Sequence, residues 1–395
     1  MQGGKGETGG EESGGGIVRI LVCPDKFKGS LSAGEAAEAI AQGISEGWPE
    51  AETVICPLAD GGEGTLEVLL SATRGQALSL EVTGPLGEAR TAPLGIAGDG
   101  VTAVVEMAAA SGLELIPHER RDPKVTTTRG TGDLIRGALD MGLRRIIVGI
   151  GGSGTNDGGT GMAAALGARF LDHEGRELPP GGGELERLAR IDLSALDHRV
   201  HEAEIVVACD VANPLLGPRG ASRVYAPQKG ATPDDVEVME KGLARLAEVV
   251  SSCVAPGLEE APGAGAAGGL GFGLMAFLGA RARPGIEVVM EVLGFAGLLH
   301  SCDLVVTGEG RLDGQTAYGK TVTGVAREAS RLGLPVLALG GEVTEEAEAL
   351  RALGISALLS ICNGPMSREQ SMARASSLLS RASREVAGLL RSLAG

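Results

Sequence analysis

The stretch Arg145–Leu166, RIIVGIGGSGTNDGGTGMAAAL, predicts a buried strand, a glycine-dense loop and the start of a helix in immediate succession. The β-branched run Ile146–Val148 is typical of a strand that is buried on both faces of a parallel sheet. The glycines between Gly149 and Gly161 permit positive φ and the close approach of another backbone or a ligand. The helix expected from Gly161 would direct its N–H groups toward this loop, which favours an anion there. The sequence therefore predicts an α/β fold with a ligand site in this loop.

Strands and helices alternate at both ends of the chain and enclose a different pattern in the middle. Two units of strand, polar loop and helix follow Ile17, and Ser32 with Glu35 predicts a capping box at the first helix. After Gly75, three short apolar runs separated by GPLG and GDG predict an antiparallel meander. We therefore expect two α/β domains. They are a discontinuous, doubly wound parallel-sheet domain of residues 17–75 and 275–395, and a second, mixed α/β domain inserted at residues 76–274, preceded by a disordered leader at residues 1–16.

Length and charge restrict the classes of function. A chain of 395 residues exceeds what one hydrophobic core usually serves, which supports two domains. The formal net charge of −16 disfavours nonspecific binding to nucleic acid or to an anionic membrane. No signal peptide or membrane span is predicted, and the six scattered cysteines are expected to be reduced thiols of a cytoplasmic protein. The expected partners are small molecules, and a homodimer is left open.

Acidic residues recur at or just beyond the ends of predicted strands, mostly beside glycine. Singly, each is explained as a turn or cap residue, and surface ion pairs would explain several. As a set they predict a site, since the carboxyl ends of parallel strands meet at one edge of a sheet. Such acids suit Mg²⁺ and a base for a hydroxyl group, while interleaved cations would neutralise phosphates or a carboxylate. The acids are Asp25, Asp60, Asp157, Asp210, Glu309 and Asp313, and the cations are Lys26, Lys28, Arg311 and Lys320.

Two short patterns indicate other enzymes. Gly149, Gly151 and Gly154 satisfy G-x-G-x-x-G after a strand, which would indicate an NAD(P)-dependent dehydrogenase of small hydroxy acids. Against this, Asp157 lies where a pyrophosphate would approach. The stretch Gly314–Thr321, GQTAYGKT, satisfies the pattern of a P-loop NTPase, but EGRLDG separates it from the apolar run VVTG. Both remain alternatives, together with non-catalytic binding of a small anion.

Five longer motifs lie in order along the chain: PDKFKGSLSA, LADGGEGT, GGSGTNDGGTGM, CDVANPLLGPRGAS and TGEGRLDGQTAYGKT. Together they resemble the bacterial glycerate kinase family, of the glycerate 2-kinase type that is associated with glyoxylate and sugar-acid utilisation. The resemblance covers nearly all of the chain from Ile17. It implies phosphorylation of D-glycerate to 2-phosphoglycerate with ATP and Mg²⁺. It also implies a flavodoxin-like domain interrupted by a second domain, and it makes the P-loop match accidental.

We assign expected roles to residues within these loops. Glycerate is expected between the two domains, and the chemical step is expected to use Asp157, Asp210 and Lys26. For Asp157, our first choice as base or metal ligand, this role predicts that Asp157→Asn keeps its melting temperature and loses activity. Substrate binding is expected from Lys28, Ser30, Arg311, Asn156 and Asn213. ATP contacts are expected from Gly151, Gly152, Ser153, Gly154, Gly268, Gly269 and Lys320, and Mg²⁺ ligands from Asp60, Glu309 and Asp313.

Overall fold

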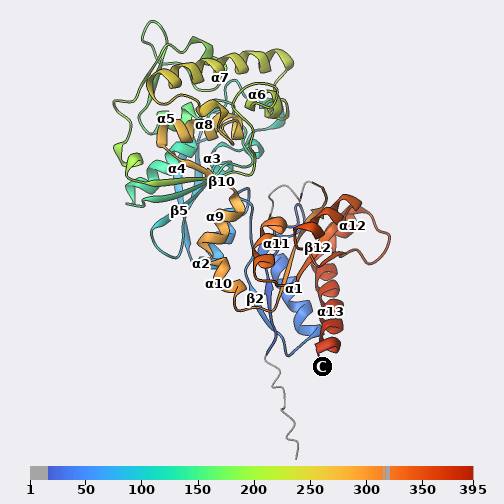
Figure 1. Cartoon of the computed structure of the whole chain (residues 1–395). Helices are drawn as coiled ribbons and strands as arrows, with labels where there is room; N and C mark the ends of the chain where they lie inside the picture. The colour runs from blue at the N-terminus through green and yellow to red at the C-terminus, as the bar shows by residue number, and fades with distance from the viewer. Residues whose placement is uncertain (1–16, 315, 317–320, 395) are drawn as a thin grey trace, which may run out of the picture.

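The computed structural model describes residues 17–314, 316 and 321–394, which build two main β-sheets with helices packed against them (Figure 1). The first sheet has the order β13-β12-β11-β1-β2, and all its neighbouring strands are parallel. Numbered along the chain within this sheet, the order is 2-1-3-4-5, which is the flavodoxin-like order. The predicted flavodoxin-like, doubly wound sheet is therefore confirmed. Its strands are β1 (Arg19–Val22), β2 (Glu52–Ile55), β11 (Leu304–Leu312), β12 (Val336–Val343) and β13 (Ala357–Ser360).

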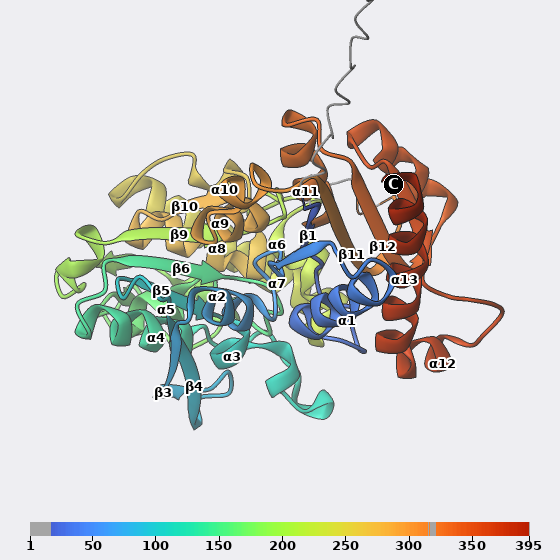
Figure 2. The same cartoon turned by 90° about the horizontal axis from the view of Figure 1, so that it is seen from below.

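Helices cover both faces of the first sheet. On one face α1 packs beside α13, and on the other face α11 and the 3₁₀-helix η7 pack on β11, β12 and β13. The predicted capping box of α1 is present, because Ser32 Oγ accepts from Glu35 N–H while the Glu35 carboxylate accepts from Ser32 N–H. Figure 2 shows α13 lying along α1 beside the sheet. The bounds are α1 (Ala33–Gly47), α11 (Thr321–Arg331), η7 (Glu345–Leu353), α12 (Arg368–Ala373) and α13 (Ala375–Ala394).

The second sheet has the order β10-β9-β6-β5-β4-β3 and combines both kinds of pairing. The β3–β4 and β4–β5 pairs are antiparallel, as the meander predicted, whereas β5–β6, β6–β9 and β9–β10 are parallel. Ile146, Ile147 and Val148 of β6 are each at most 1% exposed, which agrees with a strand buried on both faces. The strands are β3 (Gln76–Thr83), β4 (Ala89–Ile96), β5 (Thr102–Glu106), β6 (Arg145–Gly149), β9 (Glu204–Ala208) and β10 (Arg281–Arg283); β7 (Arg169–Leu171) and β8 (Arg190–Asp192) form a separate hairpin.

The two sheets share part of their hydrophobic core. Val104, Ile147 and Val206 of the second sheet belong to the same buried cluster as Leu21 and Val305 of the first. Helices α2 and α9 pack on β5 and β9 within this shared layer. The expected domain boundaries at residues 75 and 274 differ from the limits of the second sheet and its helices. Helix α2, which packs on β5, precedes the first boundary, and the edge strand β10 follows the second. The remaining helices are α2 (Thr65–Thr73), α3 (Ala108–Ser111), α4 (Arg129–Asp140), α5 (Thr160–Ala165), α6 (Ala221–Tyr225), α7 (Pro233–Cys253), α8 (Ala266–Leu278), α9 (Gly285–Val292) and α10 (Phe295–Leu299).

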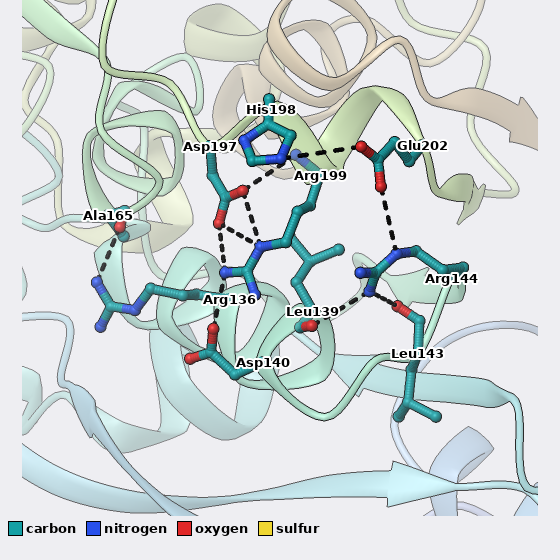
Figure 3. A network of polar contacts seen from close by, with 10 residues as sticks. All are labelled: Arg136, Leu139, Asp140, Leu143, Arg144, Ala165, Asp197, His198, Arg199 and Glu202. Carbon is teal, nitrogen blue, oxygen red and sulfur yellow. Dashed lines mark hydrogen bonds and ion pairs between the residues drawn. The ribbon is translucent and has the colours of Figure 1, made fainter.

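A polar network ties the elements at the amino ends of β6 and β9 together (Figure 3). Arg199 donates from Nη2 to Asp140 at 2.7 Å and to Asp197 at 2.6 Å. Arg144 lies 3.9 Å from the carboxylate of Glu202. Because the carboxyl ends of the strands lie at the opposite edge of the sheet, we interpret this network as structural. Among the residues that the structure describes, no helix is long and apolar enough to span a bilayer.

The glycines of α1 that face α13 allow the two helices to approach backbone to backbone. A Cβ atom on Gly43 would lie 2.0 Å from Ser380 O, whereas one on Gly34 in the same helix would lie 3.9 Å from its nearest neighbour, Ser32 Oγ. We expect Gly43→Ala to destabilise the protein by about 1–3 kcal/mol, because the helices must separate. Thermal unfolding followed by circular dichroism measures this, and Gly34→Ala is the matched control with an unchanged or slightly higher midpoint. Equal midpoints for the two variants would contradict the close contact.

Candidate active site

A cavity of about 920 Å³ lies at the carboxyl ends of the first sheet, where its strand order reverses between β1 and β11. Doubly wound sheets bind their ligands at this switch point. The loop after β1 contributes Lys26 and Lys28, and the loop after β2 contributes Asp60. Gly151 and Gly152 reach the cavity from the loop after β6, so the second sheet also contributes to its lining. The cavity is therefore bordered by loops from both sheets.

Asp25 is buried at the base of this cavity, at 6% exposure. Burial, together with the charge of Asp60, raises the pKa of its carboxyl group to about 6. Two hydrogen bonds oppose that shift: Thr321 Oγ1 donates to Oδ2 at 2.5 Å, and the backbone N–H of Lys26 donates to Oδ1 at 2.6 Å. Asp25 is therefore held in place by α11.

Asp210 approaches the same group of carboxylates from the end of β9. It accepts a hydrogen bond from the backbone N–H of Gly285 at 2.8 Å. Part of the residue is exposed to solvent, but protein atoms surround its carboxylate. This burial of the carboxylate, together with the charges of Asp60 and Asp25, raises its pKa to about 7. A carboxylate with a pKa near 7 suits a group that accepts a proton from a substrate hydroxyl.

Charged side chains dominate the part of the cavity near these acids. Lys26 Nζ donates to the backbone oxygen of Glu63 and lies 4.0 Å from its carboxylate. Arg311 pairs with Asp313 at 3.2 Å and with Glu342 at 3.7 Å. The described lining includes four cations and six carboxylates, namely Lys26, Lys28, Arg311 and Arg368 against Asp25, Asp60, Glu63, Glu309, Asp313 and Glu342. A polyanionic ligand would therefore meet an excess of negative charge here unless a cation accompanied it.

The structure brings many of the expected site residues together in this cavity. Lining residues from the expected sets are Lys26, Lys28, Ser30, Asp60, Gly151, Gly152, Glu309, Arg311 and Asp313. Asp210 lies beside them rather than in the lining, close enough for its pKa to respond to Asp60 and Asp25. Asp25 and Asp60 thus converge at one edge of the first sheet, as expected for strand-end acids, and Asp210 approaches them from the end of β9 in the second sheet.

Asp157 and Asn156 are not in the cavity, contrary to our expectation. Both are 0% exposed, inside the second sheet's helical layer. The Asp157 carboxylate accepts from the backbone N–H of Thr128 at 2.8 Å, from Thr128 Oγ1 at 2.9 Å and from the N–H groups of Gly159 and Gly161 at 3.1 and 3.2 Å. Burial raises its pKa, and these hydrogen bonds lower it. Asn156 Nδ2 donates to Ser222 Oγ at 3.1 Å. Asp157 thus bonds the loop to the start of α4, and Asn156 bonds it to α6, so both side chains hold the loop in place instead of facing the cavity.

Most of the glycines expected to contact ATP also lie away from the cavity. Gly268 and Gly269 are buried, and a Cβ on Gly268 would lie 2.0 Å from the backbone oxygen of Thr155. Gly154 is buried against Ile116, and Ser153 makes a β-bridge with Gly112. These residues let one backbone pack closely on another. Glycine permits such a contact as readily as it permits contact with a ligand.

Two further expected residues have other surroundings. Asn213 is bonded to its own loop and to α6, because its amide donates to Arg219 O at 2.7 Å and its oxygen accepts from the Tyr225 hydroxyl at 2.8 Å. Lys320 lies outside the described residues, as do most positions of the P-loop-like stretch. The strand β11 extends to Leu312, so our reason for separating that stretch from the preceding strand was wrong. The extension was hidden because EGRL lacks the apolar character of the strand before it.

Sequence reasoning missed several residues around the cavity. Asp25 was noted at a strand end but given no role, and Thr321 was considered only for the P-loop pattern. Away from the cavity, Lys229 was also missed: it is 1% exposed and donates to Thr155 O at 2.6 Å, and burial lowers its pKa to about 7. The wall formed by Cys362, Met366 and Met372 carries no motif at all. The ordinary helix-capping and apolar patterns of that segment gave no signal of a site.

These features define a two-sheet α/β enzyme with an acid-rich cavity at a flavodoxin-like switch point. The model of the Glycerate kinase family matches residues 20–391. The chain belongs to the glycerate kinase family and is a kinase, which confirms the resemblance seen in the sequence. It is similar to the glycerate kinase of Bacillus subtilis strain 168, with 48% identity over 95% of this chain and 98% of that protein.

Two other relatives are similar over the same extent. The glycerate 2-kinase of Escherichia coli K12 is 48% identical over 94% of this chain and 98% of that protein. A crystal structure described as "putative glycerate kinase 2" from Salmonella typhimurium LT2 aligns with a TM-score of 0.87 at 47% identity, covering 95% of this chain and 99% of that one. The fold class expected from the sequence is therefore confirmed by a solved structure as well.

The burial of Asp157 reverses the outcome that we expected from its substitution. In Asp157→Asn, the amide group would face backbone donors, so we expect a loss of about 1–3 kcal/mol of stability or more and a clearly lower melting temperature. The matched control is Asp99→Asn, because Asp99 also accepts from two backbone N–H groups, Val101 and Thr102, but is exposed. Thermal unfolding of both variants checks this. A stable Asp157→Asn protein with greatly reduced kcat would instead support the catalytic role.

Proposed function

We propose that the protein transfers the terminal phosphoryl group of ATP to D-glycerate and forms 2-phosphoglycerate in the cavity between the two sheets. The observation that carries the proposal is the convergence of Asp25, Asp60 and Asp210 beside Lys26, with the pKa values of two of the acids near neutrality. Family membership and the name of the Escherichia coli relative support the phosphoryl acceptor. The comparisons give no support to a dehydrogenase or a P-loop NTPase.

In this proposal Asp210 accepts the proton of the attacking hydroxyl group. Phosphoryl transfer requires the nucleophile, the phosphorus atom and the leaving oxygen to be in line, so the remaining residues mainly position and neutralise charge. Lys26 and Lys28 are the lining cations next to the acids, and we assign them to the transferred phosphoryl group and to the carboxylate of glycerate. Gly151 and Gly152 carry no side chains, so their loop packs closely on Gly62 and Ala108 while its backbone lines the cavity.

A magnesium site would be shared between protein and nucleotide. No group of three or more His, Cys, Asp or Glu side chains suited to a metal is found in the described parts of the chain, so a cage of Asp60, Glu309 and Asp313 alone is not supported. Protein-bound Mg²⁺ usually takes one or two carboxylates together with substrate phosphates. Asp25 and Asp60 fit that role, because they are close enough for one charge to shift the other's pKa. The ion would neutralise phosphate charge.

The reaction is tested directly with the purified full-length protein. We expect ADP to form only when D-glycerate and Mg²⁺ are both present. The phosphoryl group needs the hydroxyl of glycerate as its acceptor, and the carboxylates and phosphates need Mg²⁺ as a counter-ion. A coupled assay measures ADP, and ³¹P NMR distinguishes 2-phosphoglycerate from 3-phosphoglycerate. ADP formation without glycerate would indicate an NTPase, and NADH formation from a hydroxy acid would indicate a dehydrogenase; either result would remove the proposal.

The role of Asp210 predicts a pH dependence. Its carboxylate must be ionised to accept a proton, so kcat/KM for glycerate should rise as pH increases toward about 7 and level off above it. Asp210→Asn should lower kcat by about 10²-fold or more. Because the folded-state pKa is raised, ionisation of Asp210 costs stability as pH rises from about 4 to 7.

The substitution should therefore raise the melting temperature more at pH 8 than at pH 5. Asp192→Asn is a suitable control, because Asp192 is a half-buried residue of β8 that does not line the cavity. A fully active Asp210→Asn enzyme with an unchanged pH profile would exclude Asp210 as the base.

A further inference from the structure

The cavity has two chemically different ends. The end near Asp25 is rich in charged groups, as described above. The other end is formed by the segment after β13 and by α12. Its wall combines the apolar or weakly polar side chains of Ile361, Cys362, Met366, Met372 and Ala375 with the polar residues Ser367, Arg368 and Ser371. Cys362 Sγ lies 3.2 Å from Ser371 Oγ and donates to Gly341 O at 3.3 Å. One end is therefore suited to phosphate and carboxylate groups, and the other to a weakly polar ring.

We propose that this α12 end of the cavity is the subsite for the adenine base of the nucleotide, with Met366 and Met372 as its walls. The inference rests on the proposed kinase function and adds the direction in which the nucleotide lies. At about 920 Å³ the cavity is far larger than a three-carbon acid needs and lies in the range of about 300–1,000 Å³ typical of sites for larger ligands. Space therefore remains for a nucleoside once glycerate is bound near the acids.

Methionine is a suitable wall for an aromatic base. Its flexible thioether adapts to the shape of a ring and makes favourable contacts with ring edges. The chain contains only 1 Trp, 2 Tyr and 5 Phe, so few aromatic rings are available for stacking. Phe27, the aromatic residue among the described lining residues, is 2% exposed and presents little surface to a ligand. The half-buried Met366 and Met372 are the apolar side chains that a base could contact instead.

The backbone between the two ends provides a path for the phosphates. The Met372 Cε atom lies 2.7 Å from where a Cβ on Gly29 would be, so α12 packs directly on the loop that carries Lys26 and Lys28. A Cβ on Gly341 would lie 2.6 Å from Gly310 O. Gly310 and Gly341 both line the cavity, and they form a floor without side chains between the methionines and the acids. A nucleotide with its base at α12 can therefore extend its phosphates toward Lys28 and Asp25.

Calorimetric binding of Mg²⁺–ADP and of Mg²⁺–tripolyphosphate separates the two ends of the cavity. We expect Met372→Ala to weaken ADP binding at least tenfold and to raise KM for ATP by a similar factor, with tripolyphosphate binding and KM for glycerate unchanged. Met141→Ala is the matched control, because Met141 is 41% exposed and does not line the cavity. Equal weakening of ADP and tripolyphosphate, or no weakening of either, would overturn the subsite.

A footprint on the unmutated protein gives an independent test. Alkylation by iodoacetamide, read at each cysteine by mass spectrometry, should slow at least fivefold at Cys362 when ADP is bound and should not slow with tripolyphosphate. Cys253 is exposed and serves as the internal control. If ADP leaves Cys362 unprotected while glycerate-dependent turnover is normal, the base binds elsewhere and the proposed function still stands. If turnover is absent, the proposed function itself fails.

Discussion

Burial, and after it the charge of Asp60, raises the pKa values of Asp25 and Asp210 at the junction of the two sheets, so these carboxylates can lie together only if the fold holds them there. Close backbone packing provides that hold. A Cβ on Gly285 would lie 1.9 Å from Asp60 O, and the N–H of the same glycine bonds Asp210. Thr321 fixes Asp25 from α11. The shared hydrophobic layer beneath α2 and α9 keeps the two sheets in the register that this contact requires.

Much of the fold could be predicted because local patterns and burial agree. The β-branched core of β6, the capping box of α1 and the three strands of the meander each follow from a short stretch whose periodicity is unambiguous. The flavodoxin-like class came from the resemblance and matches the strand order. The strand-end positions of Asp25 and Asp60 predicted their convergence, because neighbouring parallel strands present their carboxyl ends to one edge. Asp210 joins them from the other sheet through its hydrogen bond with Gly285, which strand-end position alone does not predict.

The unpredicted part of the site depends on the direction in which loop residues face. GGSGTNDGG and GAGAAGG contain glycine for close contact, and sequence cannot distinguish contact with a ligand from contact between two backbones. In the structure Gly268 packs on the loop of Thr155, while Asp157 satisfies backbone donors inside the domain. The α12 wall was missed for the opposite reason. Met366 and Met372 are ordinary apolar residues until the chain folds Met372 against Gly29, more than 300 positions earlier.

The central pairing of the first sheet also determines how the chain can fold during synthesis. Strand β1 pairs with β11 through Ile20 and Leu304, partners 284 residues apart in the chain. At about 5–20 residues per second, the ribosome needs roughly 15–60 seconds to deliver β11 after β1. During that interval the second sheet can form from nearly contiguous chain, while β1 and β2 wait with unpaired edges that other chains could join. The nascent first sheet is thus the segment for which chaperone protection on the ribosome matters most.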